Sequence, residues 1–125
     1  MNVSALNIIT RQVKVNKGLE HVVSFMTGAP QLGSWLSPVK SVDPVLGGRI
    51  EFRAEAGFEH GATYQLLDIP EHVIIRSDKF GEIDVKFDEV DGKTIVNFTF
   101  TKADDDEYEK IIADTVTRFI AMVTY

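Results

Sequence analysis

Histidines and carboxylates are the side chains best suited to chemistry in this chain, because its 125 residues include no cysteine. Each of the three histidines, His21, His60 and His72, directly follows a glutamate. Neighbours at i and i+1 point in different directions, whereas metal ligands must converge on one point. The histidines also belong to different predicted elements. The spacing therefore argues against a metal centre, and we expect neither a metal ion nor a cofactor.

An acidic run, residues 104–107, precedes the last amphipathic segment. Calcium loops of the EF-hand type alternate their ligands and have a central glycine, and this run has neither feature. Carboxylates are favourable at the positive end of a helix dipole. Asp104 is predicted to be the N-cap of a helix, with Glu107 three residues later in a carboxylate version of the capping box.

Motifs of several large enzyme classes are absent from the sequence. It contains no H-E-x-x-H, no G-x-S-x-G, no P-loop and no dinucleotide-binding fingerprint. No acid and base can be placed together from their spacing. We therefore predict no catalytic residue, and we favour a function other than catalysis.

Polar side chains on the inner faces of predicted strands are better candidates, because a buried polar group needs a partner. Arg11 lies on the apolar side of the first predicted strand. It either orients a ligand or places its head in solvent and its stem on apolar surface. Tyr64 either contacts a ligand or donates its hydroxyl hydrogen within the core. Arg76 is predicted to point outward.

Composition places the chain among soluble globular proteins, with 44% apolar and 26% charged residues. A chain of this length forms one domain, which we assign to residues 1–125. The net charge of −6 disfavours nucleic acid and anionic membrane surfaces as partners. No stretch approaches the roughly 18 apolar residues of a membrane span, so we expect a cytoplasmic location.

Hydrophobic periodicity predicts the elements that must position these residues. The order is one strand, two helices, six strands and a long helix. The inner face of the strand at residues 62–69 stays open, because Tyr64 and Leu66 compete with Leu67 and Ile69. The strands are predicted at residues 6–15, 39–44, 49–56, 62–69, 72–77, 82–89 and 94–101, and the helices at residues 19–26, 30–36 and 104–125.

The last segment, residues 104–125, organises the rest of the chain. Its apolar residues recur at three- and four-residue steps and form one broad stripe: Tyr108, Ile111, Ile112, Val116, Phe119, Ile120 and Val123. The strands each have an apolar face with no second layer to cover it. A curved antiparallel sheet wrapped around this helix would bury the stripe of the helix and the apolar faces of the strands together. The predicted fold class is therefore α+β.

Two short segments resemble a known family. One is Val23-Ser24-Phe25-Met26-Thr27 followed by Pro30, Leu32, Trp35, Leu36 and Pro38, and the other is Gly47-Gly48-Arg49-Ile50-Glu51-Phe52. Together they resemble the START-like (SRPBCC, helix-grip) superfamily, and within it the activator-of-heat-shock-ATPase family. The chain lacks the Gly-Trp pair that members often carry in the last helix. Motif residues of this kind support a scaffold and do not identify a chemistry.

The resemblance implies a hollow between the sheet and the last helix, and we expect a small apolar or amphipathic ligand to bind there. The alternatives are a co-chaperone-like interaction module with a filled core, and a cyclase or hydrolase on the same fold. Ala54 and other small residues favour a cavity, whereas eight phenylalanines favour a filled core. The predicted cavity residues are Arg11, Trp35, Phe52, Ala54, Tyr64, Phe87, Phe98, Phe100, Ile112, Val116 and Phe119.

Overall fold

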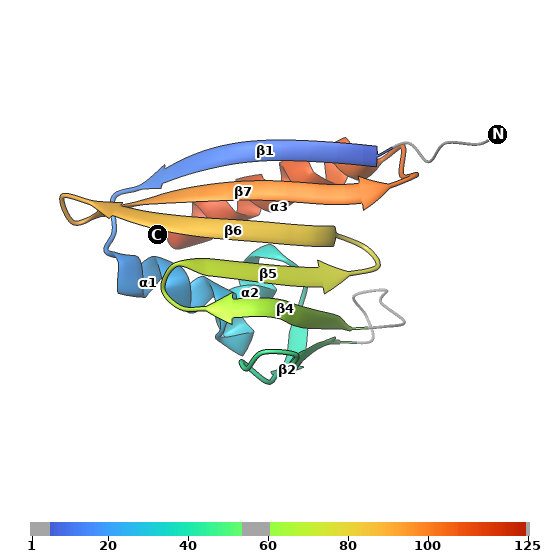
Figure 1. Ribbon diagram of the computed structural model, residues 1–125, viewed down its shortest axis with the longest axis horizontal. Helices are drawn as coiled ribbons and strands as arrows, with labels where there is room; N and C mark the ends of the chain where they lie inside the picture. Colours follow the sequence, from blue (N-terminus) through green and yellow to red (C-terminus); the bar gives the residue numbers. More distant parts are fainter. Residues whose placement is uncertain (1–5, 54–60, 125) are drawn as a thin grey trace.

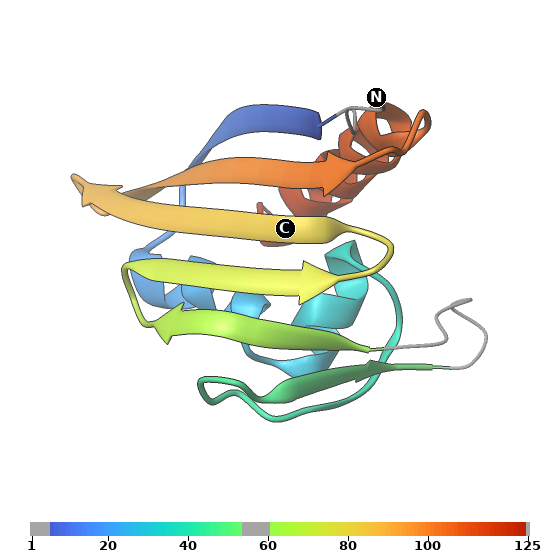
Figure 2. The ribbon, with the colours of Figure 1, turned by 45° about the vertical axis from the view of Figure 1, so that its right-hand side comes forward.

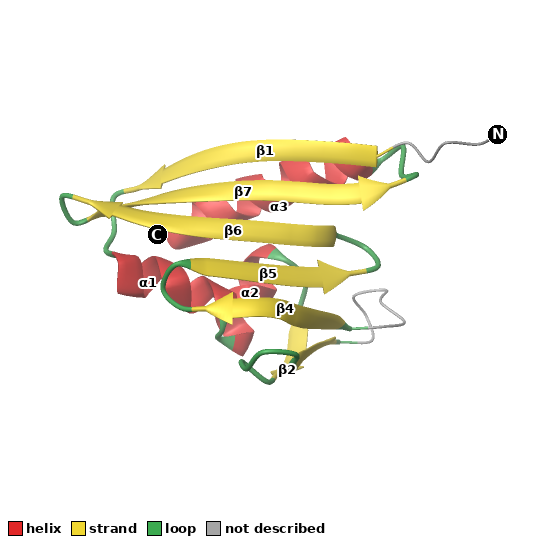
Figure 3. Cartoon of the chain, viewed as in Figure 1, coloured by secondary structure: helices red, strands yellow, loops and turns green. Residues whose placement is uncertain are grey.

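A computed structural model describes residues 6–53 and 61–124 of the chain. In these residues a seven-stranded antiparallel sheet has helices on one face (Figures 1 and 3). The strands lie in the order β1-β7-β6-β5-β4-β3-β2. In chain order the elements are β1 Leu6–Val15, α1 Leu19–Val23, the 3-10 turn η1 Ser24–Met26, α2 Ala29–Trp35, β2 Val39–Val42, β3 Arg49–Phe52, β4 Ala62–Asp68, β5 His72–Ser77, β6 Gly81–Val90, β7 Lys93–Ala103 and α3 Tyr108–Val123.

The helices divide the inner face of the sheet between them. Figures 1 and 2 show α3 behind the half that holds β1, β7 and β6, and α1 and α2 behind the other half. The element order and the single curved sheet agree with the helix-grip arrangement that the sequence predicted. The α+β fold class is therefore confirmed.

The β6–β7 hairpin turns at Asp91-Gly92 and lies between β1 and β5 in the sheet. Both residues of its turn have positive φ angles, 53° at Asp91 and 74° at Gly92, as a two-residue type I′ connection requires. The register then places Phe98 opposite Val85 and Phe100 opposite Ile83. All four side chains of these pairs are buried, so the hairpin contributes a continuous apolar surface to the core.

A β-bulge in β4 explains why the inner face of this strand could not be assigned from the sequence. The register shifts between Tyr64, which pairs with Ile75, and Leu66, which pairs with Ile74. The bulge adds one residue to β4 and so interrupts the alternation of its side chains. As a result Tyr64 and Leu67, three positions apart, both face the core. Strict alternation cannot describe a strand that contains a bulge.

The last helix begins later than predicted. It starts at Tyr108, and Asp104 adopts a left-handed conformation (φ 54°), so the prediction of Asp104 as N-cap is wrong. Asp105 instead accepts hydrogen bonds from the backbone N of Glu107 at 3.0 Å and from Lys102 at 2.8 Å. The bond from Lys102 lowers the pKa of Asp105 below its ordinary value.

The buried stripe of α3 differs from the predicted stripe at two positions. Ile120 is 42% exposed, whereas Thr115 is fully buried. Thr115 tolerates this burial because its hydroxyl donates to the carbonyl of Ile111 at 2.7 Å. The other predicted residues of the stripe are buried or partly buried against the core.

Candidate ligand groove between α1 and the β4–β5 turn

Four of the predicted cavity residues, Trp35, Phe98, Phe100 and Phe119, form a packed aromatic cluster together with Phe25. The ring of Phe119 lies edge-on to those of Phe98 and Trp35, with centroids 5.0 and 5.1 Å away. Phe98 stacks on Phe100 at 5.2 Å. Distances in this range are those of preferred aromatic contacts, so these rings pack directly against one another between the sheet, α2 and α3.

The polar atoms beside this aromatic cluster bond to the backbone. Trp35 Nε1 donates to the carbonyl of Phe25 at 2.9 Å, and the Tyr64 hydroxyl donates to the carbonyl of Met26. Burial raises the pKa of Tyr64 above its ordinary value, so the phenol stays protonated and remains a donor. The interpretation of Tyr64 as a core residue with a tied hydroxyl is confirmed.

The remaining predicted cavity residues lie around the aromatic cluster or outside the core. Phe87, Ile112 and Val116 are buried, and Phe52 is half-buried. Ala54 falls outside the described residues. The part that any of these residues plays in binding a ligand stays a prediction.

Arg11 follows the second of its two interpretations. It pairs with Phe98 across the β1–β7 ladder, yet its side chain is exposed, and its Nη1 donates to the carbonyl of Thr10 at 2.8 Å. The guanidinium therefore lies in solvent at the edge of the sheet, away from the position expected of a group that orients a ligand inside the protein. Arg76 points outward and is exposed, as predicted.

A groove opens on the opposite half of the molecule from α3. It has a volume of about 570 Å³ and lies between α1, the β4–β5 turn and the end of β6. Pockets for small molecules span about 300 to 1,000 Å³, so the groove has a suitable size. Its lining consists of Leu19, Glu20, Val23, Ser24, Thr27, Ile69, Pro70 and Glu89.

Three segments are fixed to one another to form the groove. The backbone N of Leu19 donates to Glu89 Oε2 at 3.2 Å, which ties the start of α1 to β6. The Thr94 hydroxyl donates to the carbonyl of Lys17 at 2.9 Å and holds the segment before α1 against β7. On the other wall, the backbone N of Phe87 donates to the carbonyl of Glu71 at 3.0 Å. The groove is therefore preformed by the fold.

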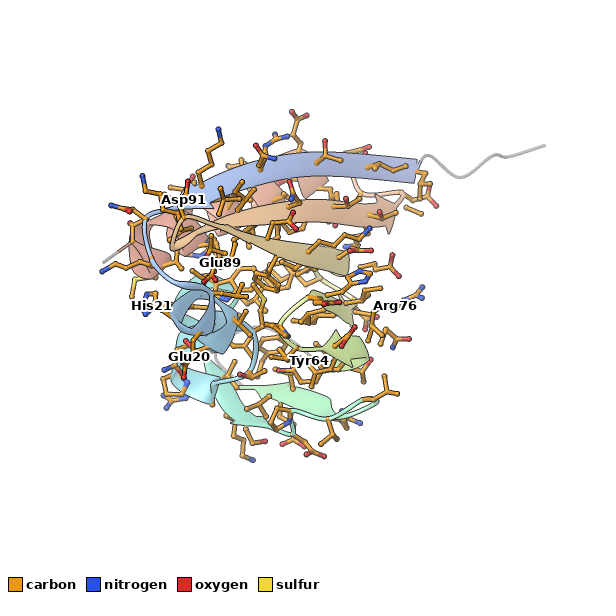
Figure 4. The ribbon with its side chains drawn as sticks, turned by 60° about the vertical axis from the view of Figure 1, so that its left-hand side comes forward. Glu20, His21, Tyr64, Arg76, Glu89 and Asp91 are labelled. Carbon is orange, nitrogen blue, oxygen red and sulfur yellow. The ribbon has the colours of Figure 1, made fainter. Side chains whose placement is uncertain are left out.

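The polar groups of the lining are acidic or neutral. Glu20 and Glu89 carry carboxylates, and Figure 4 shows both close to α1. No lining residue of this described pocket is cationic. His21 is next to Glu20 in the chain, but its Nε2 lies 3.0 Å from the carbonyl of Val123, and its ring packs edge-on against Phe25. His21 thereby joins α1 to the end of α3.

Sequence reasoning did not find the groove. Leu19 and Val23 lie within the first predicted helix, where apolar residues are expected to face the core, and in the structure they also line the groove. Ile69 was treated as a strand residue, whereas it follows β4 and is 43% exposed. An apolar residue directly before proline at a strand end was the available signal.

The family to which the fold belongs can be identified by comparison. The sequence profile described as activator of Hsp90 ATPase homolog 1-like protein matches residues 19–121. The chain belongs to this family. The resemblance stated from the sequence motifs is thus confirmed. No curated protein is similar enough in sequence to match the chain.

Solved structures of other proteins share the fold of this chain. A conserved protein of unknown function from Enterococcus faecalis has a TM-score of 0.78 at 13% identity, covering 97% of this chain and 75% of that one. A Bacillus halodurans protein has a TM-score of 0.76 at 10% identity, covering 98% and 100%. The Aha1 dimer of Colwellia psychrerythraea has a TM-score of 0.65 at 16% identity, covering 94% and 93%. At these identities the likeness shows the fold alone.

Two features are absent from residues 6–53 and 61–124. In that part of the chain no helix has the length and apolar character needed to cross a membrane. Over the same residues no group of three or more histidine, aspartate or glutamate side chains is placed to hold a metal ion.

Proposed function

We propose that this chain binds a small amphipathic molecule in the groove between α1 and the β4–β5 turn. The observation that carries the proposal is the composition of the groove, about 570 Å³ with an apolar floor of Leu19, Val23, Ile69 and Pro70 and polar groups at its border. Pockets of this kind derive affinity from the apolar surface and orientation from a few polar groups. The ligand class is the one expected from the sequence, but the proposed binding site lies beside α1 and not between the sheet and α3.

The packing of the groove supports an apolar tail as the part of the ligand that lies inside. Val23 is 5% exposed and belongs to the core, so the floor of the groove is continuous with the packed interior. Each methylene transferred from water to such a floor contributes about 0.8 kcal/mol. Affinity is therefore expected to rise about fourfold with each methylene until the groove is filled.

The test is a titration with n-alkyl maltosides of increasing chain length, kept below their micelle concentrations, followed by amide NMR. We expect the backbone signals of Leu19, Val23 and Thr27 to shift. The Ile69→Ala variant should bind about tenfold more weakly, since it removes apolar contact area from the groove wall. If no alkyl chain length shifts these signals, the proposal is wrong.

Val90→Ala is the matched control for this titration. Val90 is 51% exposed, close to the 43% of Ile69, and it is not part of the groove lining. Its truncation removes a similar kind of surface from the tip of the β6–β7 hairpin. Affinity for the maltosides should stay unchanged in this variant.

A second candidate function is that of a co-chaperone-like interaction module. It is favoured by the family match and by the aromatic cluster, because a module that acts through its surface is expected to have a filled core. The test is the ATPase rate of purified Hsp90 with and without the chain at saturating concentration. An unchanged rate and no complex in sedimentation would exclude this function. A cyclase or hydrolase activity has no comparable support from the described residues.

A further inference from the structure

We propose that the groove selects amphiphiles with a cationic head, of which an alkylamine or a quaternary alkylammonium is the simplest form. The inference rests on the proposed function and adds the charge of the ligand to it. It is carried by the position of two carboxylates, those of Glu20 and Glu89, beside the apolar floor of one groove.

The Glu89 carboxylate is held in place and keeps capacity to bind. Its Oε2 accepts one hydrogen bond from the backbone N of Leu19 at 3.2 Å. A carboxylate has about four lone-pair positions on two oxygens, so this bond fixes the group without saturating it. Glu89 is also exposed, so an incoming head group can reach it.

Glu20 supplies the second negative charge from α1. It follows Leu19 in the chain and is exposed at the border of the groove. Among the described residues the ion pairs are His72–Asp84 and Lys102–Asp105, and neither glutamate belongs to one. Both charges at the border are therefore without a cationic partner from the described chain.

Nearby cationic residues do not line the groove. Lys17 precedes α1, with its carbonyl bound to Thr94, and Lys86 pairs with His72 across β5 and β6. Neither residue belongs to the groove lining. The wider field has the same sign as the border, because the chain has a net charge of −6. An anionic head meets repulsion here, whereas a cationic head is attracted.

Fatty alkyl chains with different heads separate these cases. The probes are decyltrimethylammonium, decyl maltoside and decyl sulfate, all below their micelle concentrations, titrated with amide NMR of Leu19, Val23 and Thr27 as the readout. We expect decyltrimethylammonium to bind about three- to tenfold more tightly than decyl maltoside, and decyl sulfate to bind most weakly. The preference should shrink as salt is added, because these charges are exposed.

Glu89→Gln is the decisive variant. Glutamine keeps an acceptor oxygen for the backbone N of Leu19, so the anchor of α1 is retained while the charge is removed. The variant should lose most of the preference for decyltrimethylammonium and keep its affinity for decyl maltoside. Glu109→Gln makes the same change of charge on α3, outside the groove lining, and should keep the preference.

The outcomes distinguish the two proposals. Equal affinity for all three heads, or a preference that survives in Glu89→Gln and in Glu20→Gln, overturns the cationic-head inference and leaves the groove as a binding site. Absence of any shift with all three probes overturns the inference and the proposed function together.

Discussion

The two halves of the inner sheet face solve the same packing problem in opposite ways. Under α3 the sheet is covered by the aromatic cluster, whose members are almost fully buried and whose rings contact one another. The other half is covered by short helices, the five-residue α1 with the 3-10 turn η1 and the seven-residue α2. A short helix cannot extend along the full length of the strands, so the edge between α1 and the β4–β5 turn stays open. Closure follows from the length of the covering element.

The largest expected effect comes from opening the closed half. Phe119→Ala removes a ring that contacts Trp35, Phe98 and Phe25, and should lower the free energy of unfolding by about 3–5 kcal/mol. Urea unfolding measures this loss. Ile120→Ala, the next residue on α3 and 42% exposed, is the control and should change stability by about 0.5 kcal/mol or less. Similar losses in both variants would mean that the cluster is not the core described here.

Tyr64→Phe tests the link between the groove and the hydrogen bond that holds η1 in the core. It leaves the carbonyl of Met26 without its donor, at an expected cost of about 1–3 kcal/mol. Met26 directly precedes Thr27 in the groove lining, so groove affinity should also fall. Tyr108→Phe removes the same kind of buried bond, to the carbonyl of Phe80. It should cost as much stability without changing groove affinity, and equal binding losses would contradict the link.

A smaller effect is expected where α3 supports α2. Arg118 donates from Nε to the carbonyl of Trp35 at 3.2 Å and from Nη2 to the carbonyl of Leu36 at 3.4 Å, at the C-terminal end of α2. A cation at this end of a helix is favourable, so Arg118→Ala should cost about 1 kcal/mol in urea unfolding. Arg118→Lys keeps the charge and should recover part of the loss. An unchanged midpoint in Arg118→Ala would show that these bonds contribute nothing.

The smallest effect is expected at Arg11. Its side chain is exposed and its one hydrogen bond is to the neighbouring residue, so Arg11→Gln should change the free energy of unfolding by about 0.5 kcal/mol or less. Binding of decyl maltoside to the groove should be unaffected. A loss of ligand affinity in Arg11→Gln would return the binding site to the side of α3, where the sequence analysis placed it.

The sequence predicts most of the fold because strong local patterns carry it. The Asp91-Gly92 turn fixes the central hairpin, and the prolines around α2 limit that helix at both ends. Prediction of strand faces and helix boundaries fails where a single residue interrupts the regular backbone conformation. The bulge before Leu66 reverses the faces of β4, and the left-handed Asp104 delays α3 by one turn. Neither the bulge nor the left-handed residue can be recognised from the pattern of apolar and polar residues.

The groove was missed for a different reason. Its lining comes from three stretches of the chain, and each stretch has an adequate local explanation: Leu19 as a helix residue, Pro70 as a turn, Glu89 as a strand end. The position of a surface groove depends on where neighbouring elements end. Those ends would have to be known to within about the length of one side chain. Sequence periodicity reports which face of an element is buried and does not report how far its cover extends.

The pairing of β1 with β7 also determines when, during synthesis, β1 can join the sheet. Leu6 lies opposite Ala103, so among the described strands β1 pairs with β7, which is synthesised much later. At about 5–20 residues per second, synthesis of the roughly 80 intervening residues takes about 4–16 s. During that interval β1 lacks the strand with which it pairs in the folded sheet. β1 can therefore join the sheet only after β7 has been synthesised.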